Sequence, residues 1–163
     1  HRRRPRAGGE SAESTAATQP SGTTAMTTPL HRTELDVRWG DLDAFDHVNN
    51  ATYLDYIQEA RLRWLVSLPE ASWRDDDIHP VVVNTTCNYR TAIVWPARLA
   101  IELSVLKAGD SSLTLCHRMV DAGRPEVLYS DGHVVMVWIS RKSGRAVPLP
   151  EVVRAACVGA SGV

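Results

Sequence analysis

Residues 38–65, RWGDLDAFDHVNNATYLDYIQEARLRWL, join three local patterns without a break. The segment begins at the end of an alternating strand and continues through a polar turn that holds three aspartates, a histidine and two asparagines. It ends in an aromatic-rich helical pattern. This order places a carboxylate beside the free backbone N–H groups of a helix N-terminus, and such a pair can attack a carbonyl carbon and stabilise the oxyanion that forms. We therefore interpret the segment as a catalytic site.

The strand before the turn is predicted from alternation. Leu35, Val37 and Trp39 face one side, and the charged residues between them face the other, as a half-buried strand requires. Asn49 and Asn50 are good N-cap residues for the helix that follows.

The helix is predicted from spacing. Tyr53, Ile57, Ala60 and Trp64 recur on one stripe, and Tyr56 widens it. A second apolar strip and a narrow polar edge complete the helix surface: Leu54, Leu62 and Leu65 on the strip, and Thr52, Asp55, Glu59 and Arg63 on the edge. So little polar surface predicts a helix that is covered on several sides.

The same segment carries a specific motif, consisting of Trp39, then Asp41-Leu42-Asp43, then Asp46-His47-Val48-Asn49-Asn50, then Tyr53. Its order and spacing resemble the 4-hydroxybenzoyl-CoA thioesterase branch of the hotdog-fold superfamily, in its YbgC-like acyl-CoA thioesterase form. Members of that family usually have glycine at the position of Asp46. Because aspartate tolerates left-handed turn conformations, we expect the turn to be kept. The extra charge close to Asp43 can repel an anionic substrate.

The rest of the chain agrees with the hotdog order of one strand, one long helix and four strands. Residues 81–89, 99–105 and 113–120 alternate as strands, and residues 129–140 form a nearly continuous apolar run typical of a central strand buried on both faces. The resemblance covers residues 31–150. It implies an α+β hotdog fold, with an antiparallel sheet of about five strands wrapped around one long central helix.

The resemblance also implies a reaction, the hydrolysis of acyl-CoA thioesters without a metal or other cofactor. It assigns Asp43 as the nucleophile or as the general base that activates water. The backbone N–H of Asn50 would stabilise the oxyanion. Domains of this type usually form homodimers or homotetramers with the active site at the subunit boundary.

Several of these residues have a second, purely structural interpretation. Asp43 can cap its own turn, His47 can bind the loop backbone instead of moving protons, and Asn49 can act as a cap as well as shape the site. Tyr53 is either a core aromatic or a contact for the substrate. The basic residues outside the motif are candidates for CoA phosphate contacts or are simply solvated turn charges: Arg90, Arg141, Lys142 and Arg145.

Two other functions remain open from the sequence. A hotdog dehydratase or hydratase of acyl thioesters shares the fold, but no second histidine motif of that kind is present. A non-catalytic acyl-thioester-binding or assembly module is the third possibility, in which Asp46 marks loss of the site.

Composition excludes several classes of partner. The formal net charge of -1 provides no overall basic surface for nucleic acid. No apolar run approaches the roughly 20 residues that a membrane span needs. Cys87, Cys116 and Cys157 are odd in number and widely spaced, which predicts reduced thiols in a cytoplasmic protein without a zinc site.

The ends of the chain differ from this domain. Residues 1–30 are poor in large apolar side chains and are predicted to be disordered, and residues 151–163 are predicted to be a tail or a short helix. The arginine-rich start lacks the apolar segment of a secretory signal, and Glu10 and Glu13 count against a transit peptide. Met26 is the natural start that we expect.

Overall fold

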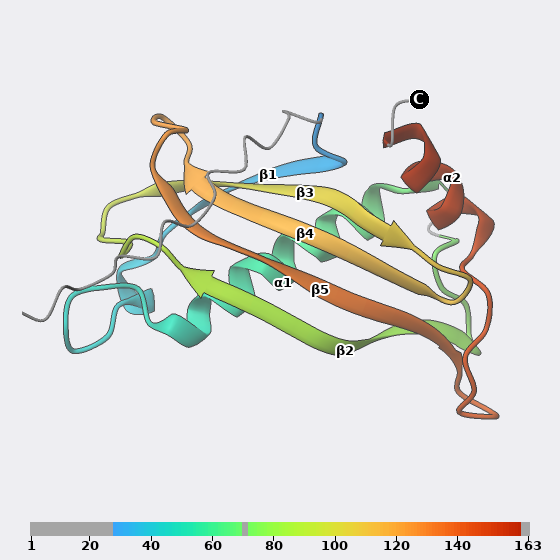
Figure 1. The fold of residues 1–163 in the computed structure, drawn as a ribbon. Coiled ribbons are helices and arrows are strands. Elements are labelled where there is room, and N and C mark those ends of the chain that lie inside the picture. The colour runs from blue at the N-terminus through green and yellow to red at the C-terminus, as the bar shows by residue number, and fades with distance from the viewer. Residues whose placement is uncertain (1–27, 70–71, 161–163) are drawn as a thin grey trace, which may run out of the picture.

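The computed structural model describes residues 28–69 and 72–160. In chain order, the elements are β1 (His31–Asp36), the 3₁₀ turn η1 (Trp39–Asp41), α1 (Asn50–Ser67), β2 (Ile78–Tyr89), β3 (Arg98–Ala108), β4 (Ser112–Asp121), β5 (Leu128–Ser140) and α2 (Glu151–Ala160). The strands form one antiparallel sheet in the order β1-β3-β4-β5-β2. Helix α1 runs along one face of this sheet (Figure 1). The predicted α+β architecture with one long helix against five strands is confirmed.

The ends of the described chain are fixed to the sheet. Residues 1–27 of the predicted disordered extension lie outside the described residues. Leu30 is already in place, because its N–H donates to the Leu103 carbonyl at 2.7 Å. At the other end, where a tail or a short helix was predicted, residues Glu151–Ala160 form α2, which buries Val153 and Cys157. Neither described helix is long and apolar enough to cross a membrane.

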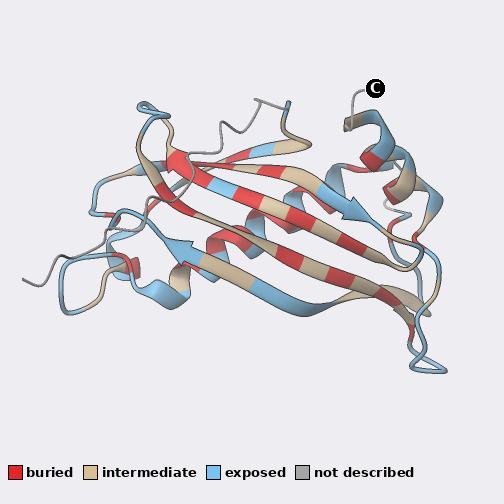
Figure 2. Ribbon diagram, viewed as in Figure 1, coloured by how far each residue is buried: buried red, intermediate tan, exposed pale blue. Residues whose placement is uncertain are grey.

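The core lies between α1 and the sheet. Along β4 and β5, buried residues alternate with partly buried ones (Figure 2). Burying each large apolar side chain contributes about 1.5–3 kcal/mol. The side chains on the helix-facing side of the three middle strands are almost completely buried: Leu99, Ile101, Leu103, Leu113, Leu115, Met119, Val134, Met136 and Trp138.

Two predictions about burial were wrong. The apolar run of residues 129–140 was predicted to be central and buried on both faces, but β5 lies next to the edge strand β2, and its outward Val135 and Val137 are only partly buried. Helix α1 was predicted to be covered on several sides, but its Leu54, Leu62 and Val66 are 42%, 41% and 66% exposed. Both differences have one cause, since the described part of a single chain provides one sheet that covers one side of the helix.

The predicted alternation also fails at Trp39, which is 73% exposed. The chain leaves the extended conformation after β1 and enters the short turn η1. This turn reverses the expected pattern, because it directs Trp39 outward and buries Asp41, which is 5% exposed.

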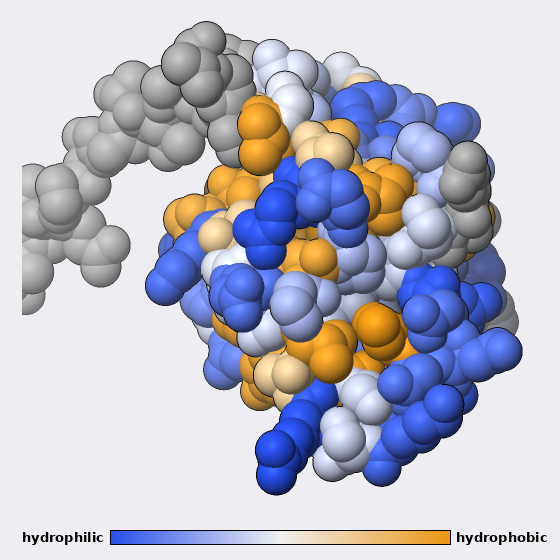
Figure 3. Space-filling view, turned by 90° about the vertical axis from the view of Figure 1, so that its right-hand side faces the viewer, coloured by the Kyte–Doolittle hydropathy of each residue, from blue (hydrophilic) through white to orange (hydrophobic). Residues whose placement is uncertain are grey.

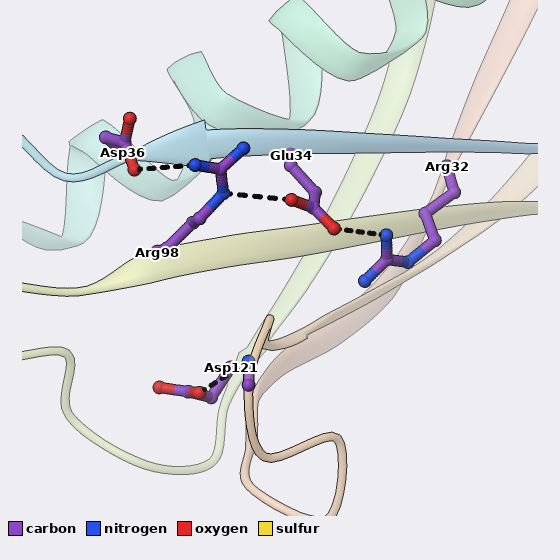
Figure 4. A network of polar contacts seen from close by, with 6 residues as sticks. Arg32, Glu34, Asp36, Arg98 and Asp121 are labelled. Carbon is purple, nitrogen blue, oxygen red and sulfur yellow. Dashed lines mark hydrogen bonds and ion pairs between the residues drawn. The ribbon is translucent and has the colours of Figure 1, made fainter.

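Ion pairs connect the neighbouring strands β1 and β3 at their outer surface (Figure 4). Arg98 donates from Nε to Glu34 at 2.9 Å and lies 3.8 Å from Asp36, and Arg32 also contacts Glu34. The hydrogen bonds from Arg32 and then Arg98 lower the pKa of Glu34. Because these side chains are partly exposed to solvent, they fix the strand pairing less than the apolar core does.

A buried polar chain crosses three strands beneath the beginning of α1. His117 on β4 lies 3.1 Å from the Ser130 hydroxyl on β5, and this hydroxyl lies 3.2 Å from the Cys87 thiol on β2. The strands pack closely here, since a Cβ on Gly132 would be 2.0 Å from the Thr86 carbonyl oxygen. Burial lowers the pKa of His117 to about 4.

This histidine predicts a specific loss of stability in acid. Below pH 6.5 the unfolded chain binds a proton at His117, whereas the folded chain resists it until the pH reaches about 4. The free energy of unfolding should therefore fall by about 3 kcal/mol more over this interval than it would without the histidine. Urea unfolding of the wild type and His117→Gln between pH 4 and 7 measures this difference, because the other titrating groups are common to both proteins. Parallel pH curves for the two proteins would contradict the prediction.

Candidate active site

The loop between η1 and α1 is a tight turn closed by its own backbone. The Asp43 N–H donates to the His47 carbonyl at 2.8 Å, and the Asp46 N–H donates to the Asp43 carbonyl at 3.2 Å. Asp46 has a φ of 59°, in the left-handed region. The aspartate at the position of the family's glycine therefore adopts the conformation that glycine would supply, and the turn is kept.

Asp43 has both of its predicted roles available. Its Oδ1 accepts the Phe45 N–H at 2.8 Å, so the carboxylate caps the turn. No residue in the described part of the chain bonds to its Oδ2, and the side chain is partly exposed. One oxygen is thus held by the loop while the other can reach water or a substrate.

A buried carboxylate attaches the loop to the helix. Asp41 accepts the Tyr56 hydroxyl at 2.6 Å, the Arg38 N–H at 3.0 Å and two guanidinium N–H groups of Arg38 at 2.9 and 3.1 Å. Burial is the largest influence on the pKa of Asp41 and raises it, but the hydrogen bonds from Tyr56 and Arg38 together outweigh burial and lower the pKa below its usual value. Asp41 is therefore not a solvated neighbour of Asp43 but a residue that stabilises the turn.

The helix begins where its capping residues predict. The Asn49 side chain accepts the Ala51 N–H at 2.9 Å, and the Asn49 N–H donates to the Asp41 carbonyl at 2.9 Å. The N–H of Asn50, the first helical residue, has no acceptor among the described residues. It is therefore free to bind an oxyanion at the positive end of the helix dipole.

The end of strand β2 contacts the beginning of α1 through Tyr89. The Tyr89 hydroxyl donates to the Asn50 carbonyl at 3.0 Å, and its ring meets that of Tyr53 edge-on at a centroid distance of 4.9 Å. Tyr53 is 3% exposed, and its hydroxyl lies 3.4 Å from the Thr91 carbonyl. Burial raises the pKa of Tyr53. Tyr53 thus packs as a core aromatic in the single chain.

The other predicted site residues are spread along the molecule. His47 is exposed at the loop, and Arg90, just beyond β2, binds Asp131 through two hydrogen bonds of 3.0 and 3.1 Å. Arg141, Lys142 and Arg145 lie in the turn after β5, beside the opposite end of β2. Because β2 is 12 residues long, these two basic groups are separated by roughly 35 Å, and one chain cannot bring them to a single CoA molecule.

Tyr56 and Tyr89 were missed as determinants of the site. The spacing of Tyr56 indicated only that it faces inward, and Tyr89 appeared only as the last residue of an alternating strand. Their hydroxyl partners, Asp41 and the Asn50 carbonyl, are 15 and 39 positions away in the sequence. No local pattern contains such pairings.

Comparisons with known proteins agree with this geometry. A family model described as the thioesterase-like superfamily matches residues 37–157. The long-chain acyl-CoA thioesterase FadM of Escherichia coli is 31% identical over 119 residues, which cover 72% of this chain and 89% of FadM.

Solved structures give the same result. The PA2801 protein of Pseudomonas aeruginosa, a candidate thioesterase, has a TM-score of 0.74 and 36% identity, covering 78% of this chain and 98% of its own. A candidate acyl-CoA thioesterase of Xanthomonas campestris has a TM-score of 0.63 and 46% identity, covering 68% of this chain and 92% of its own. The family match includes the Asp43 loop, α1 and every strand except β1. The chain therefore belongs to the thioesterase-like superfamily and is a thioesterase with the hotdog fold.

Proposed function

We propose that this protein hydrolyses acyl-CoA thioesters to a free carboxylic acid and coenzyme A, with Asp43 as the catalytic carboxylate. The observation that carries the proposal is that the loop with the partly exposed Asp43 carboxylate leads into an 18-residue helix whose first N–H, that of Asn50, has no acceptor among the described residues. The relationship to FadM, a long-chain acyl-CoA thioesterase, supports this substrate class.

Two routes use the same residues. In the first, Asp43 attacks the thioester carbon, an acyl–aspartyl anhydride forms, the coenzyme A thiolate leaves and water then hydrolyses the anhydride. In the second, Asp43 takes a proton from water as the water attacks the same carbon, and the tetrahedral intermediate then expels the coenzyme A thiolate, which takes up a proton. In both routes, negative charge develops on the thioester oxygen, and the Asn50 N–H donates to it.

Coenzyme A needs contacts that a single chain provides only in part. Arg90 lies at the same end of β2 as Tyr89, which contacts Asn50, so it is the basic residue best placed for a phosphate of a CoA bound at its own chain's site. Its present partner is Asp131, and a phosphate would compete with that carboxylate. Arg141, Lys142 and Arg145 would contribute only from a second chain.

We therefore also propose a homodimer formed at the edge strand β2. This strand has one neighbour, β5, and its outer residues Val82 and Val83 are 47% and 58% exposed. An unpaired edge with apolar side chains is a surface that a second strand can cover. Antiparallel pairing of two β2 strands would bring the turn after β5 of one chain toward Arg90 of the other.

The first test of the proposed function is Asp43→Asn, which keeps the size of the side chain and removes its charge. We expect a folded protein whose rate of CoA thiol release from acyl-CoA falls roughly a hundredfold to ten-thousandfold. Asp55→Asn is the matched control, because Asp55 is an exposed carboxylate on α1 and should be dispensable. Nearly full activity in Asp43→Asn, or a loss confined to Asp55→Asn, would rule out the proposed role of Asp43.

A wild type that releases no CoA from a panel of acyl chains would instead support the binding-module or dehydratase alternatives.

The second test is Asn50→Pro, which deletes the proposed oxyanion donor alone. Proline is favoured at the first position of a helix, and Asn49 has a ψ of 136°, which suits a residue before proline. We expect the helix to form and kcat to fall by roughly a hundredfold to a thousandfold. Asn50→Ala, which keeps the N–H, should remain near wild-type activity. Equal activity in the proline and alanine variants would show that this N–H does not stabilise the transition state.

The third test measures assembly by light scattering behind a sizing column at micromolar concentration. The wild type should have a mass at least twice the 18.0 kDa of one chain. Val83→Lys on β2 should shift the protein toward monomer because it places a charge in the proposed interface. Val158→Lys, at a valine on α2 that is also well exposed, at 67%, should not. A stable and active wild-type monomer would contradict the interface.

A further inference from the structure

A cavity lies between α1, the segment that contains Trp73 and Arg74, and strands β2 and β5. Its volume is about 230 Å³, and its apolar wall includes Leu65, Trp73 and Met136. Arg61, His79 and Arg141 also line it, so it combines an apolar wall with cationic and polar groups. Within one chain the cavity is separate from the Asp43 loop, because Arg61 is about three helical turns beyond Asn50 on α1. In the proposed dimer, the β2 wall of the cavity, which includes Val82, would lie at the subunit boundary.

Arg61 is the unusual residue of this cavity. It is 9% exposed, and its guanidinium has no hydrogen bond or ion pair with any residue in the described part of the chain. Burial alone lowers its pKa. The next arginine on the helix, Arg63, is half-exposed and pairs with Glu59 at 2.7 Å. The guanidinium nitrogens are not fully enclosed, so water or a ligand can reach them. A guanidinium that is largely removed from water keeps its charge, and such a charge is costly without an anion beside it.

The groups around Arg61 add positive charge to the cavity. Arg141 donates from Nε to Nδ1 of His79 at 3.1 Å, which keeps the Arg141 guanidinium at the cavity wall. Arg74 lies over the Trp73 ring, 4.8 Å from its centroid. The end of the molecule that carries the turn after β5 shows hydrophobic and hydrophilic groups in close alternation (Figure 3).

The nearby acidic residues do not neutralise Arg61. Asp75 and Asp76 line a neighbouring cavity of about 370 Å³ together with Arg74 and Arg141, and Arg61 is not among its lining residues. The Asp75 side chain accepts the N–H groups of Asp77 and Ile78 at 2.8 and 2.6 Å. Its carboxylate therefore stabilises its own turn.

We propose that this cavity binds the carboxylate of a small apolar organic acid, with Arg61 as the principal contact. The planar guanidinium fork matches a carboxylate with two parallel hydrogen bonds. The apolar wall favours an acid with a hydrocarbon or aromatic body over inorganic phosphate. Phosphate would lose its hydration on entering the cavity, and it has no apolar surface to contact the wall. The volume suits a ligand of about the size of benzoate.

Benzoate is the probe for this site, and ¹⁵N-labelled arginine side chains are the readout in the wild-type protein. We expect saturable binding with a Kd of roughly a millimolar or lower and a shift of one buried guanidinium signal. Benzamide is uncharged and similar in shape, and its affinity should be lower than that of benzoate by roughly tenfold or more. Absence of saturable benzoate binding, as expected if a second copy of this chain fills the cavity, would overturn the proposal. Phosphate binding without benzoate binding would also overturn it.

Substitutions assign the binding to Arg61. Arg61→Met keeps an unbranched side chain of comparable reach and should reduce benzoate affinity by roughly tenfold to a hundredfold. Arg63→Gln removes the neighbouring, exposed cation and should leave the affinity unchanged. Equal affinity in the wild type and Arg61→Met would place the acid elsewhere. If Arg61→Met does not fold, Arg61→Lys identifies the Arg61 signal, because that signal is missing from the spectrum of this variant. The proposal then requires that this is the signal that benzoate shifts in the wild type.

A kinetic comparison distinguishes two sources of the carboxylate. If the site takes a free acid, Arg61→Met should hydrolyse glutaryl-CoA and butyryl-CoA in the wild-type ratio. If it takes the distal carboxylate of a bound acyl chain, the variant should lose its preference for glutaryl-CoA selectively. Only this comparison rests on the proposed thioesterase activity, since benzoate binding is measured without turnover and can fail or succeed independently of it.

Discussion

The buried carboxylate of Asp41 is the contact on which the candidate site depends. It connects the turn after β1 with the second turn of α1, through Arg38 on one side and Tyr56 on the other. The Arg38 side chain is 82% exposed, but the carboxylate itself is buried, and a buried carboxylate without partners would be costly. The Asp43 turn and the Asn50 N–H therefore have a fixed relationship before any substrate binds.

The sheet provides the second constraint. Tyr89 at the end of β2 supports the Asn50 carbonyl, and the pairing of β2 with β5 positions that tyrosine. The same strand is one of the two edges of the sheet, and β1 is the other. Assembly at the β2 edge would act directly on the strand that supports the helix start, so catalysis and dimerisation would depend on shared residues.

Helix α1 has different polar groups toward its two ends. Asp43, in the loop before the helix, and the N–H of Asn50, its first residue, suit chemistry at a thioester, whereas Arg61, six positions before the last helical residue Ser67, is a largely buried cation without an anion among the described residues. The interior of the helix lies against the core through Ile57 and Ala60. A rigid apolar centre thus separates two polar sites.

The sequence alone determined the features that depend on neighbouring residues. The spacing of the Asp43–Asn50 segment specified the turn, the asparagine cap and the helix start, and alternation specified the strands, because backbone hydrogen bonds and side-chain periodicity act over a few residues. Tertiary structure decided which of these side chains are buried. Asp41 rather than Trp39 points inward, and Arg61 lies in a cavity whose described lining residues include no acid. Burial depends on partners such as Tyr56 and β2, which only the folded sheet brings near.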